Sequence, residues 1–217
     1  MYYIIKSYFS KLFIKKYIPI FTDHFKNVDI NFEEINVITP DVSSEEAKDM
    51  IKRSSFVFLM GGDPFKQLKM CEQLDIISDI KGYDGILLGM SAGAMMMSKY
   101  IIITPCSEEY PDFQIGEGLN FDNISIYPHN NTESEEYPEE LFANDELYQK
   151  QDLLKVAKEY GKFYLLQDHE REDKLFDVSY IKSINGDIEL HTENNGRIWE
   201  VDNDIVLIQM GNKKIRK

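Results

Sequence analysis

Short apolar runs alternate with stretches of helical spacing along the first half of the chain. The apolar runs of strand length are residues 34–38, 55–60 and 85–88. Apolar residues recur at helical spacing in residues 3–26, 43–52, 65–80 and 92–97. Because the strand-like runs are continuously apolar rather than alternating, they predict a parallel sheet covered by helices on both faces.

Local signals place the ends of these elements. Ser43, with Glu46 three residues later, forms a capping-box pattern that predicts a helix to about Lys52. Asp63 suits an N-cap and Pro64 a first helical position, so a helix is expected over residues 65–80. Residues 3–26 are interpreted as a helix, with a short strand over residues 2–5 as the open alternative.

The second half of the chain changes character. Residues 132–146 contain seven carboxylates and predict a solvated segment that leads into a helix over residues 145–160. Short strands are expected at residues 101–104, 124–127, 163–166, 178–183, 187–192, 197–201 and 205–209. Asn185-Gly186 and Asn195-Gly196 are typical of hairpin turns. The pattern predicts one α/β domain over residues 1–217, with a mostly parallel central sheet and an antiparallel C-terminal edge.

Charge and composition exclude several classes of partner. The 217 residues carry 24 Lys and Arg against 38 Asp and Glu, a net charge of -14. Nucleic acids and anionic membranes require a basic surface, so neither is expected as a partner. Lysines interrupt the apolar N-terminus, which contains no pattern of a signal peptide or membrane span. Two cysteines provide no disulfide framework, and we expect a cytoplasmic protein.

The run Gly89-Met90-Ser91-Ala92-Gly93 offers the strongest chemical signal. It has the form G-x-S-x-G between an apolar strand and a helix, the turn on which hydrolases of α/β fold present a serine nucleophile. The backbone N–H group of Ala92 would lie at the helix start, where it can stabilise an oxyanion. Gly61-Gly62 follows the preceding strand, and the N–H group of Gly62 is the second expected oxyanion donor.

A serine nucleophile requires a base, and His129 is the best placed histidine. It follows the apolar strand at residues 124–127, and catalytic groups gather at the carboxyl ends of parallel strands. Glu108 and Glu109 lie between serine and histidine in the chain and are the candidates for the orienting acid, with Asp112 as a lesser one. The other histidines are His24, His169 and His191. Cys106 is a rival nucleophile, but its neighbours Pro105 and Ser107 do not form a nucleophile elbow. Metal-binding and phosphate-loop motifs are absent from the sequence, so neither a metal nor a cofactor is expected.

These landmarks, in this order, resemble the peptidase E family of serine peptidases, which includes aspartyl dipeptidases and cyanophycinases. The resemblance is strongest over residues 56–129: Gly61-Gly62, the Ser91 elbow and Pro128-His129. It implies a fold similar to class I glutamine amidotransferases, Ser91 as nucleophile, His129 as general base, and a small peptide as substrate. An amidotransferase itself would require cysteine at the elbow, where this chain has serine.

The chain departs from the family pattern at two places. The family's aspartate falls near Cys106, and cyanophycinase-like relatives use a glutamate slightly later, which favours Glu109 or Glu108 as the acid. The N-terminal unit is expected to be shortened, so that residues 1–5 or a partner chain, as in a homodimer, would cover the sheet edge. Lys99 alone lies near residues 101–103, so a preference for aspartate is not expected. The competing hypothesis is an inactive binding or scaffold protein on the same fold.

Overall fold

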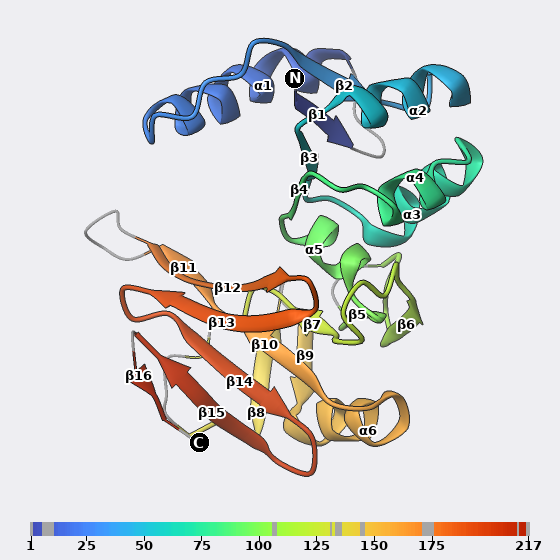
Figure 1. The fold of residues 1–217 in the computed structure, drawn as a ribbon. Coiled ribbons are helices and arrows are strands. Elements are labelled where there is room, and N and C mark those ends of the chain that lie inside the picture. The colour runs from blue at the N-terminus through green and yellow to red at the C-terminus, as the bar shows by residue number, and fades with distance from the viewer. Residues whose placement is uncertain are drawn as a thin grey trace. The chain divides into compact units, whose positions relative to one another are not determined.

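The chain forms two compact units, Met1–Met97 and Ser98–Lys217, and each is described by itself (Figure 1). The computed structural model describes residues 2–5, 11–105, 108–130, 132, 136–143, 146–170, 176–211 and 213–215. The single continuous domain and its shortened N-terminal unit stay predictions.

The first unit is built on a parallel sheet of four strands in the order β2-β1-β3-β4. Its elements are β1 (Tyr2–Ile5), α1 (Lys11–Lys26), β2 (Ile35–Ile38), α2 (Ser44–Arg53), β3 (Phe56–Leu59), α3 (Pro64–Gln73), α4 (Ile77–Lys81), β4 (Ile86–Gly89) and α5 (Ala92–Met97). The alternative of a strand at residues 2–5 is confirmed, so the helix expected over residues 3–26 is wrong at residues 3–5, and its described part is α1. Within the sheet β1 lies between β2 and β3.

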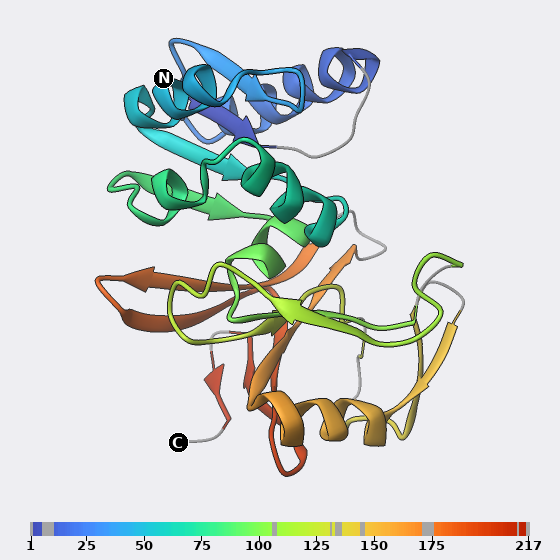
Figure 2. The ribbon, with the colours of Figure 1, turned by 90° about the vertical axis from the view of Figure 1, so that its right-hand side faces the viewer.

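Helices lie on both faces of this sheet, as the apolar strands predict, but Ile86 and Leu88 of β4 are exposed. On one face, Phe21 and Phe25 of α1 pack edge-on against Phe58 of β3, with ring centroids 5.6 and 6.5 Å apart. The alternate β3 side chains, Val57 and Leu59, are fully buried and point to the opposite face. Figure 2 shows α2 and α3 on that side of the sheet, facing the viewer. Their inner positions are buried as well.

The single helix expected over residues 65–80 is wrong, because two helices occupy the segment. Asp63 caps α3 by accepting a hydrogen bond from the N–H group of Lys66 at 2.9 Å, as predicted. The helix ends because Asp75 adopts a left-handed backbone with φ of 53°, and the N–H group of Ile76 donates to the carbonyl of Cys71 at 3.0 Å. This is the Schellman pattern of a helix end.

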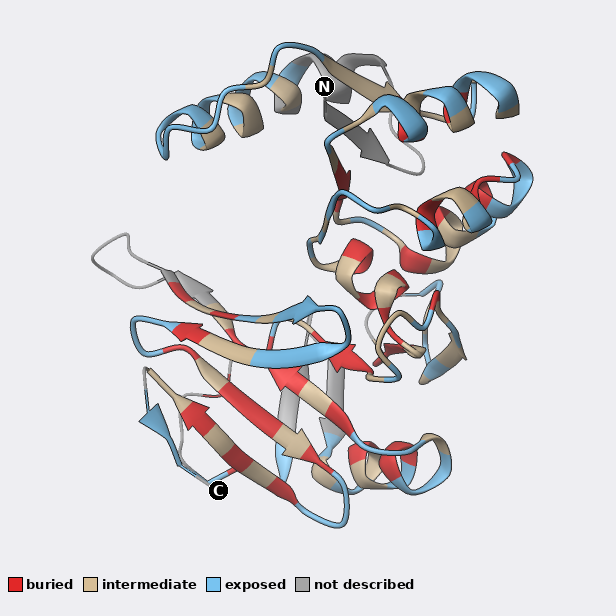
Figure 3. Ribbon diagram, in the orientation of Figure 1, coloured by how far each residue is buried: buried red, intermediate tan, exposed pale blue. Residues whose placement is uncertain are grey.

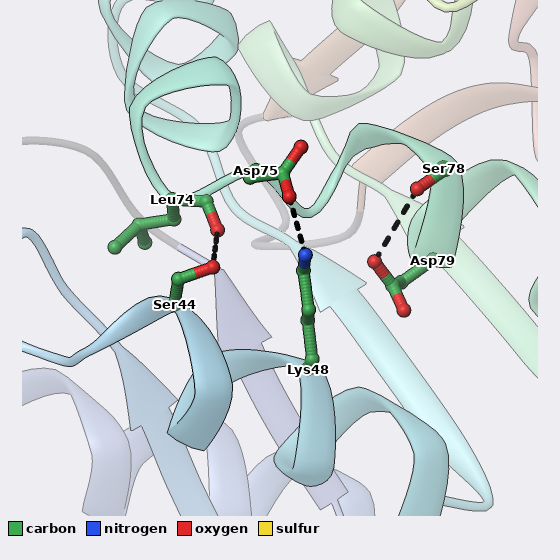
Figure 4. A network of polar contacts seen from close by, with 6 residues as sticks. All are labelled: Ser44, Lys48, Leu74, Asp75, Ser78 and Asp79. Carbon is green, nitrogen blue, oxygen red and sulfur yellow. Dashed lines mark hydrogen bonds and ion pairs between the residues drawn. The ribbon is translucent and has the colours of Figure 1, made fainter.

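Polar contacts hold α2 to this junction between α3 and α4 (Figure 4). Ser44 Oγ at the start of α2 donates to the carbonyl of Leu74 at 2.6 Å, and Lys48 forms an ion pair with Asp75. Ser43 caps α2, since its side chain accepts from the N–H group of Glu46 at 3.2 Å. The helix start predicted from Ser43 is confirmed.

The second unit contains a mixed five-stranded sheet in the order β16-β15-β14-β10-β7. Only β7 and β10 are parallel, and the C-terminal strands join antiparallel, as expected for the C-terminal edge. The elements are β5 (Tyr100–Ile103), β6 (Gln114–Glu117), β7 (Ile126–Tyr127), β8 (Glu140–Ala143), β9 (Glu146–Gln149), α6 (Lys150–Tyr160), β10 (Phe163–Leu166), β11 (Asp168–Glu170), β12 (Phe176–Ile184), β13 (Asp187–Glu193), β14 (Arg197–Val201), β15 (Ile205–Met210) and β16 (Lys213–Lys214). Smaller sheets pair β5 with β6, β8 with β9, and β12 with β11 and β13.

Trp199 on β14 belongs to the second core and is fully buried, as are Phe163 and Leu165 of β10 and Leu153 of α6. Figure 3 shows buried residues along β10, β14 and β15. Tyr137 packs edge-on against Trp199, with ring centroids 5.2 Å apart. The prediction of a solvated segment over residues 132–146 is therefore wrong at its centre, where this aromatic side chain joins the core. The helix expected from residue 145 begins at Lys150, after β9.

The two predicted hairpin turns have different outcomes. Asn185-Gly186 joins β12 to β13 with Ile184 paired to Asp187, as predicted. Asn195-Gly196 is not a hairpin turn, because β13 and β14 belong to different sheets. There Asn194 has a φ of 56°, and the segment passes the chain from one sheet to the next.

Candidate active site

Ser91 lies on a strained turn between β4 and α5. Its φ of 53° is in the left-handed region, which a non-glycine residue adopts at a cost in free energy. The flanking glycines are required by close packing. A Cβ atom on Gly93 would lie 2.0 Å from the carbonyl oxygen of Leu59, and one on Gly89 would lie 2.8 Å from the backbone nitrogen of Ala94. The local geometry thus has the strain and the close approach of a nucleophile elbow.

Gly61-Gly62 lies directly beside this elbow, within the same unit. A Cβ atom on Gly61 would lie 3.4 Å from Ser91 Cβ and 3.7 Å from Ser91 Oγ. Gly62 has a φ of 138°, a conformation that side chains disfavour. Parallel pairing of β3 with β4 explains the proximity, since both turns follow the same edge of the sheet. The oxyanion roles of the Gly62 and Ala92 N–H groups stay predictions.

His129 forms a short hydrogen bond in the second unit. Its Nδ1 atom lies 2.6 Å from Oδ2 of Asp168, and 53% of its side chain is exposed. An ionised carboxylate only accepts hydrogen bonds, so the contact places a proton on Nδ1. In the neutral imidazole, Nε2 is then the basic nitrogen. The arrangement suits a general base whose ring is oriented by a carboxylate.

Parallel strand pairing brings these two residues together. His129 follows β7, and Asp168 follows β10 at the start of β11. Because β7 and β10 are parallel neighbours, both segments leave the sheet at the same edge. The N–H group of Asn130 donates to the carbonyl of Leu166 at 3.0 Å and links the two segments. His129 itself has a φ of 62°, so its backbone is also strained.

Sequence reasoning missed Asp168. The signal that favours His129, a polar residue just after a short apolar strand, is also present at Asp168 after residues 163–166. The pattern assigns that run to the short strands of the C-terminal half, and it does not show which strand the run pairs with. Glu108 and Glu109 are exposed residues after β5, and their role as the orienting acid stays a prediction. The structure pairs the His129 ring with Asp168.

The remaining candidates for nucleophile and base lie elsewhere. His24 is on α1, and His191 on β13 contacts Glu189 Oε2 at 3.0 Å. The side chain of His169 and all of Cys106 are outside the described residues. Cys71 is fully buried in α3, and this burial raises the pKa of its thiol to about 12. The Cys71 thiolate, which would be the reactive form, is therefore strongly disfavoured.

Two features are absent from the described part of the chain. It contains no group of three or more His, Cys, Asp and Glu side chains placed to hold a metal ion. None of its helices combines the length and the apolar character needed to cross a membrane.

Comparison with known proteins identifies the family. Residues 11–164 match the model of peptidase family S51, which is more than half of the chain, and the protein belongs to this family. None of the curated proteins compared with the chain matches it significantly.

Solved structures show the same fold. A protein from Listeria monocytogenes EGD-e described as a peptidase E is 15% identical, with a TM-score of 0.59 over 89% of this chain and 85% of that chain. A peptidase from an acI-B1 Actinobacterium is 14% identical, with a TM-score of 0.57 over 100% of this chain and 83% of that chain. The fold is therefore the α/β fold of peptidase E, similar to class I glutamine amidotransferases, as expected.

Proposed function

We propose that this member of the peptidase family is a serine peptidase that cleaves small peptides of dipeptide size, with Ser91 as nucleophile, His129 as general base and Asp168 as orienting acid. The hydrogen bond of 2.6 Å between His129 and Asp168 carries the proposal. A serine elbow alone is also compatible with an inactive scaffold. An imidazole whose Nδ1 atom is bound to a carboxylate is the arrangement that activates a serine.

The proposed reaction proceeds through an acyl-enzyme. Ser91 Oγ attacks the peptide carbonyl carbon while His129 Nε2 accepts the hydroxyl proton. The N–H groups of Gly62 and Ala92 stabilise the oxyanion of the tetrahedral intermediate. When the C–N bond breaks, the same proton passes from His129 to the leaving amine. Water then attacks the ester carbonyl while His129 Nε2 accepts a proton from it. When the ester C–O bond breaks, His129 returns this proton to Ser91 Oγ, which frees Ser91 and releases the carboxylic acid.

The strand that follows the serine helix bears on the substrate. Residues 101–103 of β5 are apolar and buried. Lys99 precedes this strand, and the Lys99 ammonium group lies 5.3 Å from the centre of the Tyr100 ring. An aspartate side chain requires a cation or several hydrogen-bond donors. We therefore propose a substrate range that is not confined to N-terminal aspartate. The proposed enzyme is cytoplasmic.

Hydrolysis of a dipeptide panel tests the proposal. The panel varies the N-terminal residue and includes aspartate, and product amine is measured for the purified protein and its variants. Ser91→Ala is expected to lower kcat by at least about 10⁴-fold, and Asp168→Asn by about 10³- to 10⁴-fold. Ser78→Ala changes a serine on the surface of α4 and serves as the control. A folded protein that cleaves none of the panel, or a Ser91→Ala variant with full activity, would overturn the proposal in favour of the scaffold hypothesis.

A further inference from the structure

Gln167 immediately precedes Asp168 and is completely buried in the second unit. Neighbouring strands hold it on several sides. Its N–H group donates to the carbonyl of Arg197 at 3.1 Å, and its own carbonyl accepts from the N–H group of Ser179 at 2.9 Å. Its side-chain Oε1 accepts from Arg197 Nη1 at 3.4 Å. The residue is thus fixed through both its backbone and its side chain.

Arg197, which accepts the hydrogen bond from the Gln167 N–H group, is itself held in place by a second hydrogen bond. Ser179 Oγ donates to the carbonyl of Arg197 at 2.7 Å, so β12 and the start of β14 are joined at this point. Asp168 continues directly from Gln167 into β11, where it pairs with Val178 of β12. The backbone that carries the Asp168 carboxylate is therefore restrained on both sides of its Cα atom.

The Gln167 side chain lies in a group of buried polar atoms. Among the described residues, its Nε2 atom is buried without a hydrogen-bond partner, and so are Arg197 Nε and Asp168 Oδ1. Unpaired buried polar groups destabilise a fold, whereas an apolar side chain of similar size would leave none. The group includes an oxygen of Asp168, the residue next to Gln167 in the chain, whose other oxygen contacts the His129 ring.

We propose that Gln167, anchored by Arg197, is a positioning residue that keeps the Asp168 carboxylate on His129 Nδ1. The inference rests on the proposed function for its catalytic consequence, but its geometric part concerns the second unit alone. A base must be held within a narrow range of position and angle to be effective, and a displacement of one ångström can lower a rate by about 100-fold. Gln167 restricts the position and angle of the His129 ring by holding the adjacent residue, Asp168, in place.

The state of the His129 ring is the direct readout. In protein labelled with ¹⁵N-histidine, NMR separates the tautomer protonated on Nδ1 from the one protonated on Nε2, and His129→Gln identifies the signal among the four histidines. We expect the Nδ1-protonated tautomer to predominate in the native chain. Gln167→Met removes the acceptor for Arg197 at similar side-chain length. It should lower the share of this tautomer and speed exchange of the Nδ1 proton with solvent by about tenfold or more.

A matched control and a double variant separate positioning from general destabilisation. Gln209 on β15 is also a buried glutamine, and its Nε2 atom donates to the carbonyl of Leu190 at 3.1 Å. Gln209→Met should leave the His129 tautomer unchanged. In an Asp168→Asn background, Gln167→Met should have no further effect, because its influence passes through the carboxylate. If Gln167→Met fails to fold, Arg197→Met provides the same test, since methionine keeps an unbranched side chain but has no hydrogen-bond donor for Gln167 Oε1.

Activity measurements complete the experiment. Gln167→Met should lower kcat on dipeptides by about 10- to 100-fold, with KM changed by less than about twofold. An unchanged tautomer and proton exchange in Gln167→Met would overturn the inference, and so would an equal effect in the Asp168→Asn background. If the native chain hydrolyses no dipeptide while the tautomer responds as expected, the positioning role stands and the proposed peptidase function fails.

Discussion

Gly61 and Gly93 both lie at the Ser91 elbow, but the space beside them differs. A Cβ atom on Gly93 would overlap the Leu59 carbonyl oxygen at 2.0 Å, whereas one on Gly61 would make ordinary contact with Ser91 Oγ at 3.7 Å. Gly93 is therefore required for packing of α5 on the end of β3. Gly61 is required by the proposed chemistry, because its missing side chain leaves room beside the nucleophile.

Alanine at each position should separate these roles. Gly93→Ala is expected to lower the free energy of unfolding by about 3 kcal/mol, because the backbone must move to relieve the overlap. Gly61→Ala should change it by less than about 1 kcal/mol but lower kcat/KM by about 100-fold, since the methyl group would fill space beside Ser91 Oγ that the proposed reaction requires. Urea unfolding and dipeptide hydrolysis measure the two effects. Full activity in folded Gly61→Ala would contradict this role.

Sequence reasoning at the residue scale succeeds where chemistry is encoded in a contiguous motif. Ser91 stands in a five-residue pattern, and the structure gives it the strained backbone that the pattern implies. Asp168 lies 39 residues from His129 and meets it only because two strands pair in parallel. Spacing along the chain pointed to Glu108 and Glu109 because strand pairing is not visible in a single sequence.

At the scale of elements, apolar periodicity predicted most strands and helices. It failed where a helix ends without the glycine that usually marks such an end. The periodic pattern runs on through the α3–α4 junction, but the chain turns at Asp75, where glycine would be the ordinary signal. Periodicity also could not show the β8–β9 pair or the burial of Tyr137, since acidic residues surround both.

The left-handed backbone of Asp75 makes a stability prediction. Asp75→Gly and Asp75→Ala both remove the ion pair with Lys48, which is exposed and contributes little. Only glycine adopts the φ of 53° without strain. Asp75→Gly should therefore be more stable than Asp75→Ala by about 1 kcal/mol, measured by urea unfolding. Equal stability of the two variants would show that the junction relaxes to another conformation.

At the scale of the whole molecule, the residues named in the proposed reaction are divided between the two compact units. Ser91 and Gly62 belong to the first unit, and His129 and Asp168 belong to the second. Family membership supports a peptidase activity, and the roles of these four residues are part of the proposal. The competing scaffold hypothesis predicts the same fold and the same strained turn, so it differs from the peptidase hypothesis only in the reactivity of Ser91.

Reaction with a fluorophosphonate tests that reactivity most directly, because the probe modifies a serine only when a base activates it. Intact mass and peptide mapping should show one label per chain on Ser91. Labelling should disappear in Ser91→Ala and be slowed in His129→Gln and Asp168→Asn. A folded native chain that stays unlabelled, or that is labelled at another residue, would contradict Ser91 as the nucleophile of this protein.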